Sequence, residues 1–549
     1  MDVEVAQVDE TEIPLEDREG NTPTGGRGDV KETVQEILSS VFNATSTDAD
    51  NALFISRLRS RLDKCFKFFR VPVAKQRRLR ILSEVSGIIK PGRMTLVLGP
   101  SGSGKTTFLL SLSGQLSPCL KVSGKVGYNG YEFHECEPRK NAAYVSQQDL
   151  HVGEMTVRET FLYSARSQGF GPASVQMDLL EKENEMGISP HPEVHKYMEA
   201  RVAPGVADHL LTGYALKILG LESCADTLIG DSVQHGISED QKRSVTTGEM
   251  LVGPFRTFFM DETSSGLDSS TTKQIVACFR NLCHSLENTV VMSLLRPSPE
   301  TFSLFDDIIL LSEGQVLFHG DRADVLEFFE DCGFKCPERK PIAEFLLEVT
   351  SPKDQEQYWV NKQQLYSYVT ATQFREAFWT KSQEGIRHAK ELETPFDKTK
   401  SHSLALSPSN FPVSYNNILK INLAKEWLLM RRNFKIYGAR FTAVTTVAIL
   451  ASTLYFRGKM KREDLQDAQL YASVIFCGIV TMLLDGYTEV VLTVYRLPLF
   501  FKHRDLLFLP AWAYTISRAV VNIPVSLIQS VLWTAITYYT IGLASALER

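Results

Sequence analysis

The pattern of apolar and polar residues divides the chain into an N-terminal part with short apolar runs and a C-terminal part with long ones. Short runs of the kind that form strands lie at residues 78–98, 141–148, 255–260, 288–294 and 307–312. Mainly helical patterns separate these runs, the longest over residues 155–222. Strands that alternate with helices predict an α/β domain with a mainly parallel sheet.

Three long apolar runs follow residue 430, at residues 437–456, 470–494 and 519–541. A membrane-spanning helix needs about 20 apolar residues, so each run is a candidate span, and buried helices of a soluble protein are the alternative. Asp485 and Glu489 lie four positions apart in the second run. They either line a polar path or mark the water-facing end of the helix, and we favour the water-facing end.

The composition of the remaining segments completes a division into five parts. Residues 1–30 are acidic and rich in Gly, Thr and Pro, which predicts disorder, and residues 31–77 have helical periodicity. We assign residues 78–350 to the α/β domain, residues 351–430 to a polar linker and connecting region, and residues 431–549 to a partial membrane domain with the three spans.

Charge and cysteine content narrow the possible partners and compartments. The 549 residues include 59 basic and 65 acidic ones, a net charge of −6 that gives no reason to expect nucleic acid as a partner. The nine cysteines are scattered without a C-x-x-C pair, which favours reduced thiols in the cytosol. The N-terminus has no apolar signal segment, so we expect the α/β domain to stay in the cytosol.

A glycine-rich stretch after the apolar run at residues 94–98 fits the pattern G-x-x-x-x-G-K-[ST] of a phosphate-binding loop. Glycines let backbone N–H groups turn towards phosphates, and the N-terminus of the following helix adds positive charge. We expect Lys105 to reach the β and γ phosphates and the Thr106 hydroxyl to hold Mg²⁺. A glycine-rich turn that binds nothing is the alternative. The expected nucleotide-binding residues are Gly99, Pro100, Ser101, Gly102, Ser103, Gly104, Lys105, Thr106 and Thr107.

Polar residues follow two of the other predicted strands. Asp261 and Glu262 come directly after the run at residues 255–260, in the order and spacing of a Walker B element. We expect Asp261 to bind Mg²⁺ through water and Glu262 to polarise the attacking water. Gln147 ends the run at residues 141–148 and suits a sensor of the γ phosphate and of Mg²⁺. The predicted catalytic residues are therefore Glu262 and Gln147, and the predicted metal site is Thr106, Asp261 and Gln147.

Together these motifs resemble an ATP-binding cassette (ABC) transporter of the G subfamily, specifically the first half of a plant-type pleiotropic drug resistance (PDR) protein. The most specific stretches are residues 85–94, 153–160 and 245–253, and residues 496–505 support the resemblance further. The resemblance implies a P-loop α/β cassette with helical and β subdomains, followed by an all-α transmembrane domain. A membrane domain of this family has twice as many spans as the three found here, which predicts a chain truncated within that domain.

The resemblance also implies partners and a function. A segment that follows Glu262 matches the loop through which two cassettes touch: Ser265, Gly266, Leu267 and Asp268. The implied protein is an ATP-driven exporter half that needs ATP, Mg²⁺ and a second cassette, and that moves a lipophilic molecule across a membrane. The implied location is the plasma membrane with the cassette in the cytosol. The alternative is a membrane-anchored ATP-binding protein that does not transport, either a fragment or a regulatory partner.

The chain departs from the family in its signature segment, which in a closed dimer caps the ATP of the opposite cassette. The family reads Ser-Gly-Gly-Gln, and this chain has Ser238, Glu239, Asp240 and Gln241. Two unit charges 4 Å apart repel by ~4 kcal/mol at an effective dielectric of 20, so we expect an impaired signature. The alternative is that both carboxylates turn into solvent.

Two further departures concern the nucleotide. The family's switch histidine falls on Leu295, which neither donates a hydrogen bond nor carries a proton. The family also has a longer segment between residue 64 and residue 80, which leads to the aromatic residue that stacks on adenine. Phe66, Phe68 and Phe69 either take over that contact or pack in the core, and we favour packing.

Overall fold

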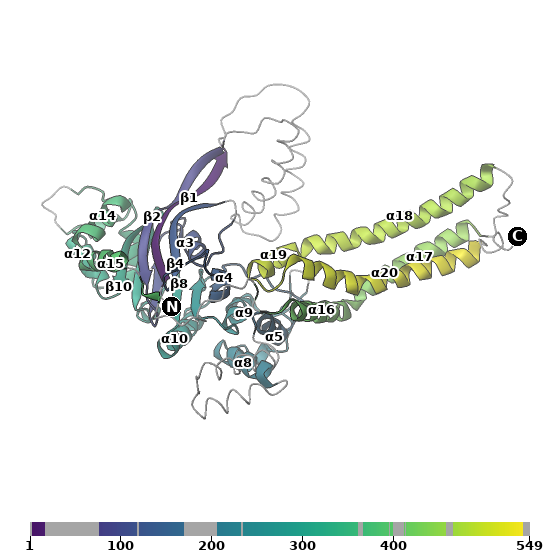
Figure 1. Cartoon of the computed structure of the whole chain (residues 1–549), viewed down its shortest axis with the longest axis horizontal. Coiled ribbons are helices and arrows are strands. Elements are labelled where there is room, and N and C mark those ends of the chain that lie inside the picture. Colours follow the sequence, from purple (N-terminus) through teal and green to yellow (C-terminus); the bar gives the residue numbers. More distant parts are fainter. Residues whose placement is uncertain are drawn as a thin grey trace, which may run out of the picture.

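The structure is a computed structural model that joins an N-terminal α/β domain to three long helices (Figure 1). It describes residues 3–16, 76–117, 120–169, 206–231, 234–360, 366–394, 396–398, 411, 413–456 and 465–541. Most of the predicted helical region at 31–77 lies outside the described residues, as do Phe66, Phe68 and Phe69. The predicted class, an α/β domain followed by an all-α membrane part, is confirmed.

The main sheet has six strands in the order β10-β9-β3-β8-β7-β6. All neighbouring pairs are parallel except β9 and β10, which are antiparallel. Every residue of β3, β6, β7 and β8 is buried, as expected for parallel strands covered on both faces. The strands are β3 (Met94–Leu98), β6 (Ala142–Val145), β7 (Thr257–Met260), β8 (Thr289–Ser293), β9 (Asp307–Ser312) and β10 (Gln315–Asp321).

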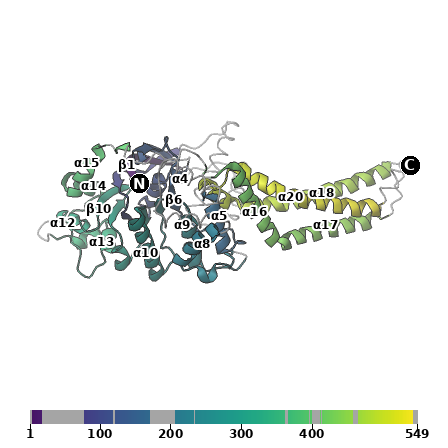
Figure 2. The same cartoon turned by 60° about the horizontal axis from the view of Figure 1, so that its bottom comes forward.

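Helices cover this sheet, and three of them extend the domain towards the long helices. α5, α8 and α9 pack on one another and lie between the sheet and the membrane part (Figure 2). The helices of the domain are α3 (Lys105–Leu112), α4 (Pro138–Asn141), α5 (Val157–Ser167), α8 (Val206–Ile218), α9 (Glu239–Leu251), α10 (Ser269–Leu286), α11 (Pro299–Phe302), α12 (Val325–Asp331) and α13 (Ile342–Glu348), with short 3₁₀ turns η1 (Glu222–Cys224) and η2 (Gln355–Tyr358).

A second, antiparallel sheet has the order β2-β1-β4-β5 and corrects one prediction. β1 (Val3–Glu16) lies between β2 (Gln76–Ile89) and β4 (Lys121–Tyr128), which pairs in turn with β5 (Tyr131–Glu132). We expected disorder throughout residues 1–30. Composition misled that prediction, because the acidic segment begins with the apolar–polar alternation of a strand and pairs with two strands that are rich in Arg and Lys.

Residues 371–393, which we expected in a polar linker, are folded helices. α14 (Ala371–Lys381) and α15 (Gln383–Glu393) both pack on β10. Phe374 and Phe378 of α14 are fully buried, and a capping box between Thr370 and Gln373 fixes the start of the helix. The segment looked polar because only a narrow stripe of each helix faces the domain.

The membrane part begins with α16 (Tyr415–Arg432) and continues through α17 (Phe434–Leu454), α18 (Leu465–Tyr495), α19 (Leu497–Asp505) and α20 (Ala511–Ile541). Among the described residues, three helices are long and apolar enough to cross a membrane: Phe434–Leu454, Ala472–Tyr495 and Ala511–Tyr538. The third begins before the predicted residue 519. Arg518 does not end the helix, because Glu489 of α18 pairs with its charge.

Asp485 and Glu489 lie within the last three turns of α18 and bind cations on both neighbouring helices. Our expectation that they mark the water-facing end of the helix stays a prediction. The Arg440 guanidinium of α17 donates to Asp485 at 2.7 and 3.0 Å and to Glu489 at 3.1 Å. Arg518 of α20 donates to Glu489 at 2.5 Å. The two acids line a cavity of about 520 Å³ between α18 and α20. They are therefore part of a polar cluster inside the helical bundle.

The burial of Phe378 gives a test of the folded α14. Phe378→Ala should lower the free energy of unfolding by about 3–5 kcal/mol, because it leaves a large cavity beside β10. Urea unfolding of the detergent-solubilised chain, followed by tryptophan fluorescence, measures the change. Ile386→Ala on α15 is the control, since Ile386 is 41% exposed and its loss should cost less than about 0.5 kcal/mol. Equal effects of the two changes would contradict the packing of α14.

Candidate functional site

The loop Gly99–Thr107 connects β3 to α3 in the strand–loop–helix order that the sequence predicts. Gly102 and Gly104 have positive φ angles of 81° and 95°, a conformation that favours glycine. A Cβ atom on Gly99 would lie 2.2 Å from the carbonyl oxygen of Leu311. Gly102 and Gly104 are therefore required by the backbone conformation of the loop, and Gly99 by the close approach of β9.

Lys105 is the first residue of α3 and is only 5% exposed. Its ammonium group donates to the carbonyl oxygens of Gly99 at 2.8 Å and Pro100 at 3.0 Å. Burial lowers the pKa of Lys105, while the negative charges of Glu262 and Asp261 oppose that shift. The buried Ser103 hydroxyl has no hydrogen-bond partner among the described residues. This arrangement of a cation, a hydroxyl and a helix N-terminus suits a phosphate group.

The two acids lie at the carboxyl end of β7, beside the end of β8. Asp261 is fully buried and accepts hydrogen bonds from the hydroxyls of Ser293 at 2.8 Å and Tyr144 at 3.3 Å. Both partners are uncharged hydroxyls, so neither neutralises the Asp261 carboxylate. Carboxylate oxygens are ligands that Mg²⁺ prefers. The Ser293 hydroxyl also accepts from the backbone N–H of Glu262 at 2.8 Å, which fixes where that residue leaves the strand.

Gln147 and Glu262 contact each other directly. The Gln147 amide donates to the Glu262 carboxylate at 2.7 Å, because β6 and β7 are neighbours and both residues follow their carboxyl ends. Burial raises the pKa of Glu262, and the charge of Asp261 raises it further, against the lowering effects of Lys105 and Arg243. A raised pKa makes a carboxylate a better proton acceptor near neutral pH.

Sequence reasoning missed three residues that shape this site: Ser293, Tyr144 and Arg243. A polar residue at the end of an apolar strand is a usable signal, and Ser293 has it. Arg243 gives no such signal, since an arginine on a helix is usually solvent-facing. It is 2% exposed, and its guanidinium donates to the carbonyl oxygens of Gln147 at 2.6 Å and Glu262 at 2.7 Å. It thereby holds the backbone of both predicted catalytic residues.

The signature segment lies at the exposed N-terminus of α9. Ser238 caps the helix, and its side chain and that of Gln241 form a capping box. Glu239 pairs with Lys242 at 2.8 Å, and its side chain is 83% exposed. Asp240 is also exposed. Both acids of the predicted signature thus extend from the surface.

The predicted dimer-contact loop is also at the surface. Ser265, Gly266 and Leu267 form a turn in which Gly266 has a φ angle of 84°, and Asp268 caps α10 by accepting from the backbone N–H of Thr271 at 3.3 Å. Leu295 follows β8 by two residues and is half-buried. The structure therefore groups the loop, Gln147, Asp261 and Glu262 in one site, and leaves the signature and the contact loop facing outward.

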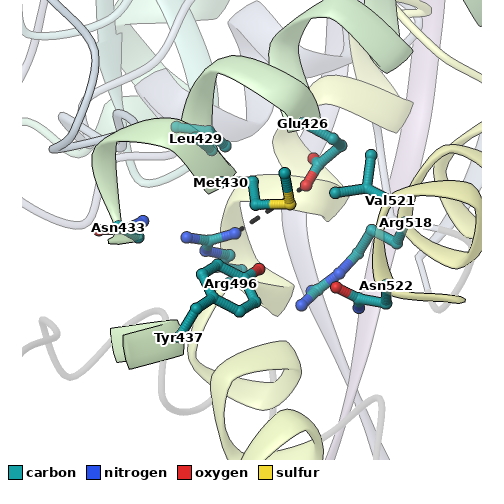
Figure 3. A pocket seen from close by; sticks show the side chains of 9 residues that line it. All are labelled: Glu426, Leu429, Met430, Asn433, Tyr437, Arg496, Arg518, Val521 and Asn522. Carbon is teal, nitrogen blue, oxygen red and sulfur yellow. Dashed lines mark ion pairs between the residues drawn. The ribbon is translucent and has the colours of Figure 1, made fainter. Parts of the chain in front are cut away.

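Ion pairs connect the N-terminal domain to the membrane part. Arg432 of α16 donates to the Glu159 carboxylate of α5 at 2.6 and 2.8 Å. Arg496, just before α19, donates to Glu154 at 2.9 Å and lies 4.0 Å from Glu426 of α16. Figure 3 shows Arg496 between Glu426 and Tyr437, with Arg518 on the opposite wall of a small pocket. The end of α16 is thus paired with α5, and the residue before α19 with the segment just before α5.

The comparison with family models divides the chain in the same way. A model described as "ABC transporter" matches residues 82–265, and one described as "ABC-2 type transporter" matches residues 418–549. The rice (Oryza sativa subsp. japonica) "ABC transporter G family member 42" is 51% identical over 86% of this chain and 32% of its own length. "Pleiotropic drug resistance protein 1" of Nicotiana tabacum is 49% identical over 85% of this chain and 33% of its own length.

The chain belongs to the ABC transporter G family. "ABC transporter G family member 34" of Arabidopsis thaliana is 46% identical over 95% of this chain and 35% of its own length. The chain spans about a third of the length of these curated relatives. A solved structure described as a dimeric ATP-binding cassette bound to ADP and Pi covers 46% of the chain at 20% identity, with a TM-score of 0.33. The assignment of this ABC chain as an ATP-binding membrane protein rests on the sequence matches and the three apolar helices.

Nucleotide binding at the Lys105 loop can be measured through stability. A ligand present at 100 times its Kd stabilises the folded state by about 2.7 kcal/mol, so saturating ATP should raise the Tm of the ABC chain by several degrees. Lys105→Ala should abolish this shift, because it removes the cation of the loop. Lys217→Ala, on the exposed face of α8, should keep it. A full ATP shift in Lys105→Ala would contradict the assigned site.

Proposed function

We propose that this chain is the ATP-binding half of an ATP-driven exporter of the G/PDR type, which moves lipophilic small molecules across a membrane together with a second cassette. The observation that carries the proposal is the salt-bridged junction between the cassette and the membrane helices. Arg432 with Glu159 and Arg496 with Glu154 place both partners of each pair within 3 Å. A membrane anchor alone would not require such a junction, whereas a transporter must pass motion through it.

Within the site, the residues take the following proposed roles. Lys105 and the loop amides bind the β and γ phosphates, and Glu262 accepts a proton from the attacking water. Thr106, Asp261 and Gln147 hold Mg²⁺, which when bound supplies positive charge to the phosphate oxygens. These three side chains suit Mg²⁺ because each supplies an oxygen atom. Asp261 is in addition a buried acid whose hydrogen-bond partners are uncharged. Gln147 keeps Glu262 in place through their hydrogen bond.

A second cassette completes the proposed site. Exposed residues in both predicted contact segments support this: Gly266 and Asp268 in one, and Ser238, Glu239 and Asp240 in the other. We also propose that the signature segment of this chain, which would contact the nucleotide of the second cassette, is impaired. Glu239 and Asp240 bring negative charge to a helix N-terminus that would otherwise attract the γ phosphate. Lys242 offsets part of the Glu239 charge.

We further propose a plasma-membrane location with the cassette in the cytosol. The support is the family resemblance and the three apolar helices among the described residues. The cavity between α18 and α20 combines the charged cluster with apolar residues such as Met482 and Val490. This mixed lining is compatible with a lipophilic molecule that carries a polar group.

Export by the chain together with a second cassette tests the proposal. Inside-out vesicles that contain the chain and a second ABC cassette should accumulate lipophilic dyes when ATP is added, and Lys105→Ala and Glu262→Gln should each reduce the initial rate by about 10² or more. The reason is that the first change removes the phosphate-binding cation and the second removes the proton acceptor. Dye fluorescence inside filtered vesicles gives the rate.

Lys217→Ala is the control for this experiment and should export at the wild-type rate. Equal dye accumulation in vesicles with the wild-type chain and with Lys105→Ala, together with normal ATP binding by the wild type, would overturn the exporter proposal. That result would favour the membrane-anchored protein that does not transport.

The proposed signature defect predicts a gain of function. Changing Glu239→Gly and Asp240→Gly together should raise ATP turnover at the partner's site by about 30-fold, since ~2 kcal/mol of repulsion from the γ phosphate would be removed. The measurement uses a mixed dimer in which Lys105→Ala silences this chain's own site. Glu222→Gly with Glu287→Gly is a charge-matched surface control. An unchanged turnover in the signature variant would refute the account of the impairment.

A further inference from the structure

We propose that the gap between β2 and β4 is a binding slot for an extended acidic strand, and that residues 3–16 of the same chain, β1, fill this slot and thereby strengthen nucleotide binding at the Lys105 loop. This inference rests on the proposed function only in so far as the loop binds ATP. It assigns a regulatory role to a segment that contains none of the motifs of the nucleotide site.

The slot is defined by the two strands on either side of β1. β2 and β4 both pair with β1 along its length, and within the described part of the chain they do not pair with each other. Val5, for example, is the register partner of Gly87 in β2 and of Val126 in β4. Without β1, both strands would present unpaired backbone N–H and C=O groups to the gap, and such edges are templates for another strand. The slot therefore selects an extended segment.

Charge favours an acidic occupant of the slot. The sequence of β1 has acidic residues and no basic one, whereas the facing strands are rich in Arg and Lys. Glu12 is the register partner of both Arg80 and Lys121. Opposite charges at paired positions of neighbouring strands stabilise the pairing, and like charges destabilise it. The acidic residues are Glu4, Asp9, Glu10, Glu12 and Glu16, and the basic ones are Arg77, Arg78, Arg80, Lys121 and Lys125.

The position of β1 in the chain makes its docking separable from the formation of β2. Residues 17–75 lie between the two strands in the sequence, so they are not joined as a hairpin. Closing a longer loop costs more chain entropy than closing a short turn. The pairing of β1 therefore depends on the slot itself, and conditions that change the slot change the docked fraction of β1.

β2 connects the slot to the nucleotide loop through the turn between β9 and β10. The backbone N–H of Ser83 in β2 donates to the carbonyl oxygen of Gly314 in that turn at 2.9 Å. The backbone N–H of Gly314 in turn donates to the carbonyl oxygen of Ser103 at 3.2 Å. Two hydrogen bonds thus join the strand beside β1 to the residue before the last glycine of the loop.

The pairing of β1 with β2 is irregular at the residues that contact the loop. The register shifts there, so that Ile81 and Leu82 lie together opposite Thr11. An irregularity of this kind bends a strand and redirects its side chains. A Cβ atom on Gly104 would lie 2.9 Å from the Leu82 side chain, so β2 packs directly against the loop. Docking of β1 therefore fixes the shape of β2 where it supports the phosphate-binding residues.

Hydrogen exchange on the intact chain in lipid vesicles tests the inference. If docking of β1 strengthens ATP binding by some factor, ATP must strengthen docking by the same factor, so saturating ATP should slow exchange of the amides of Val3–Glu16 about tenfold. Lys105→Ala should abolish this slowing, because ATP no longer binds. Lys217→Ala, on the exposed face of α8, should retain it.

A chain that lacks residues 1–16 gives a second test. The deletion should weaken ATP binding about tenfold, and a synthetic peptide of residues 3–16 should bind the truncated chain and restore its ATP affinity. A peptide with Val5→Pro and Val8→Pro keeps the charge but lacks two backbone donors, and it should not bind. A peptide with Asp9→Lys, Glu10→Lys and Glu12→Lys should not bind either, because like charges then face each other. Fluorescence anisotropy of labelled peptide and labelled ATP gives both affinities.

Several results would contradict the inference. These are equal exchange of β1 with and without ATP in a wild type that binds ATP, an unchanged ATP affinity after the deletion, and binding of the charge-reversed peptide. If the truncated chain does not fold, the exchange measurement on the intact chain decides alone. Failure of the wild type to bind ATP would refute the nucleotide site, and failure to export despite ATP binding would refute the exporter proposal. Binding of the peptide to the truncated chain is measured independently of both.

Discussion

The buried guanidinium of Arg243 is the constraint on which the nucleotide site depends. It donates to backbone carbonyl oxygens at the ends of β6 and β7, namely those of Ser146, Gln147, Asp261 and Glu262, and to the side chain of Asp149. Those carbonyls lie past the carboxyl ends of their strands, where the sheet no longer supplies donors. Because one side chain satisfies them, the backbone of Glu262 can adopt a φ angle of 43° and still present its carboxylate beside Gln147.

The same principle of paired burial operates in the membrane part. Arg440 and Arg518 balance Asp485 and Glu489, and Asn522 and Gln529 donate to the same two carboxylates at 2.9 and 3.3 Å. Charged residues inside a membrane are costly unless they are paired, so this cluster allows α18 and α20 to remain helical where a charge would otherwise end a span. It also explains why a cavity with both polar and apolar walls persists between these helices.

Local patterns in the sequence were sufficient for much of the fold and for the centre of the site. The strands before Gly99 and before Asp261 were predictable, because apolar runs that end in specific polar residues are local features. The pairing of β1 with β2 and β4, the packing of α14 on β10 and the role of Arg243 were not, since each depends on contacts with residues far away in the chain. The ion pair between Arg518 and Glu489, 29 positions apart, is likewise a distant contact. Because of it, the last span begins earlier than the apolar pattern predicts.

The two ends of α9 lie in different electrostatic environments: the first turn is exposed, and Glu249 near the last turn is buried. Acidic residues in the predicted signature are therefore compatible with an intact fold. Carboxylates in the first turn of a helix are favoured by its positive N-terminus, so Glu239 and Asp240 stabilise α9. In the proposed dimer that same positive end would otherwise bind a phosphate of the partner's nucleotide, and the acids would compete with the phosphate for those N–H groups. At the other end, Glu249 is buried and held by Lys502 and His151, independently of the exposed first turn. A change at the signature can therefore weaken the response to a partner's nucleotide without loosening the contact between α9 and α19.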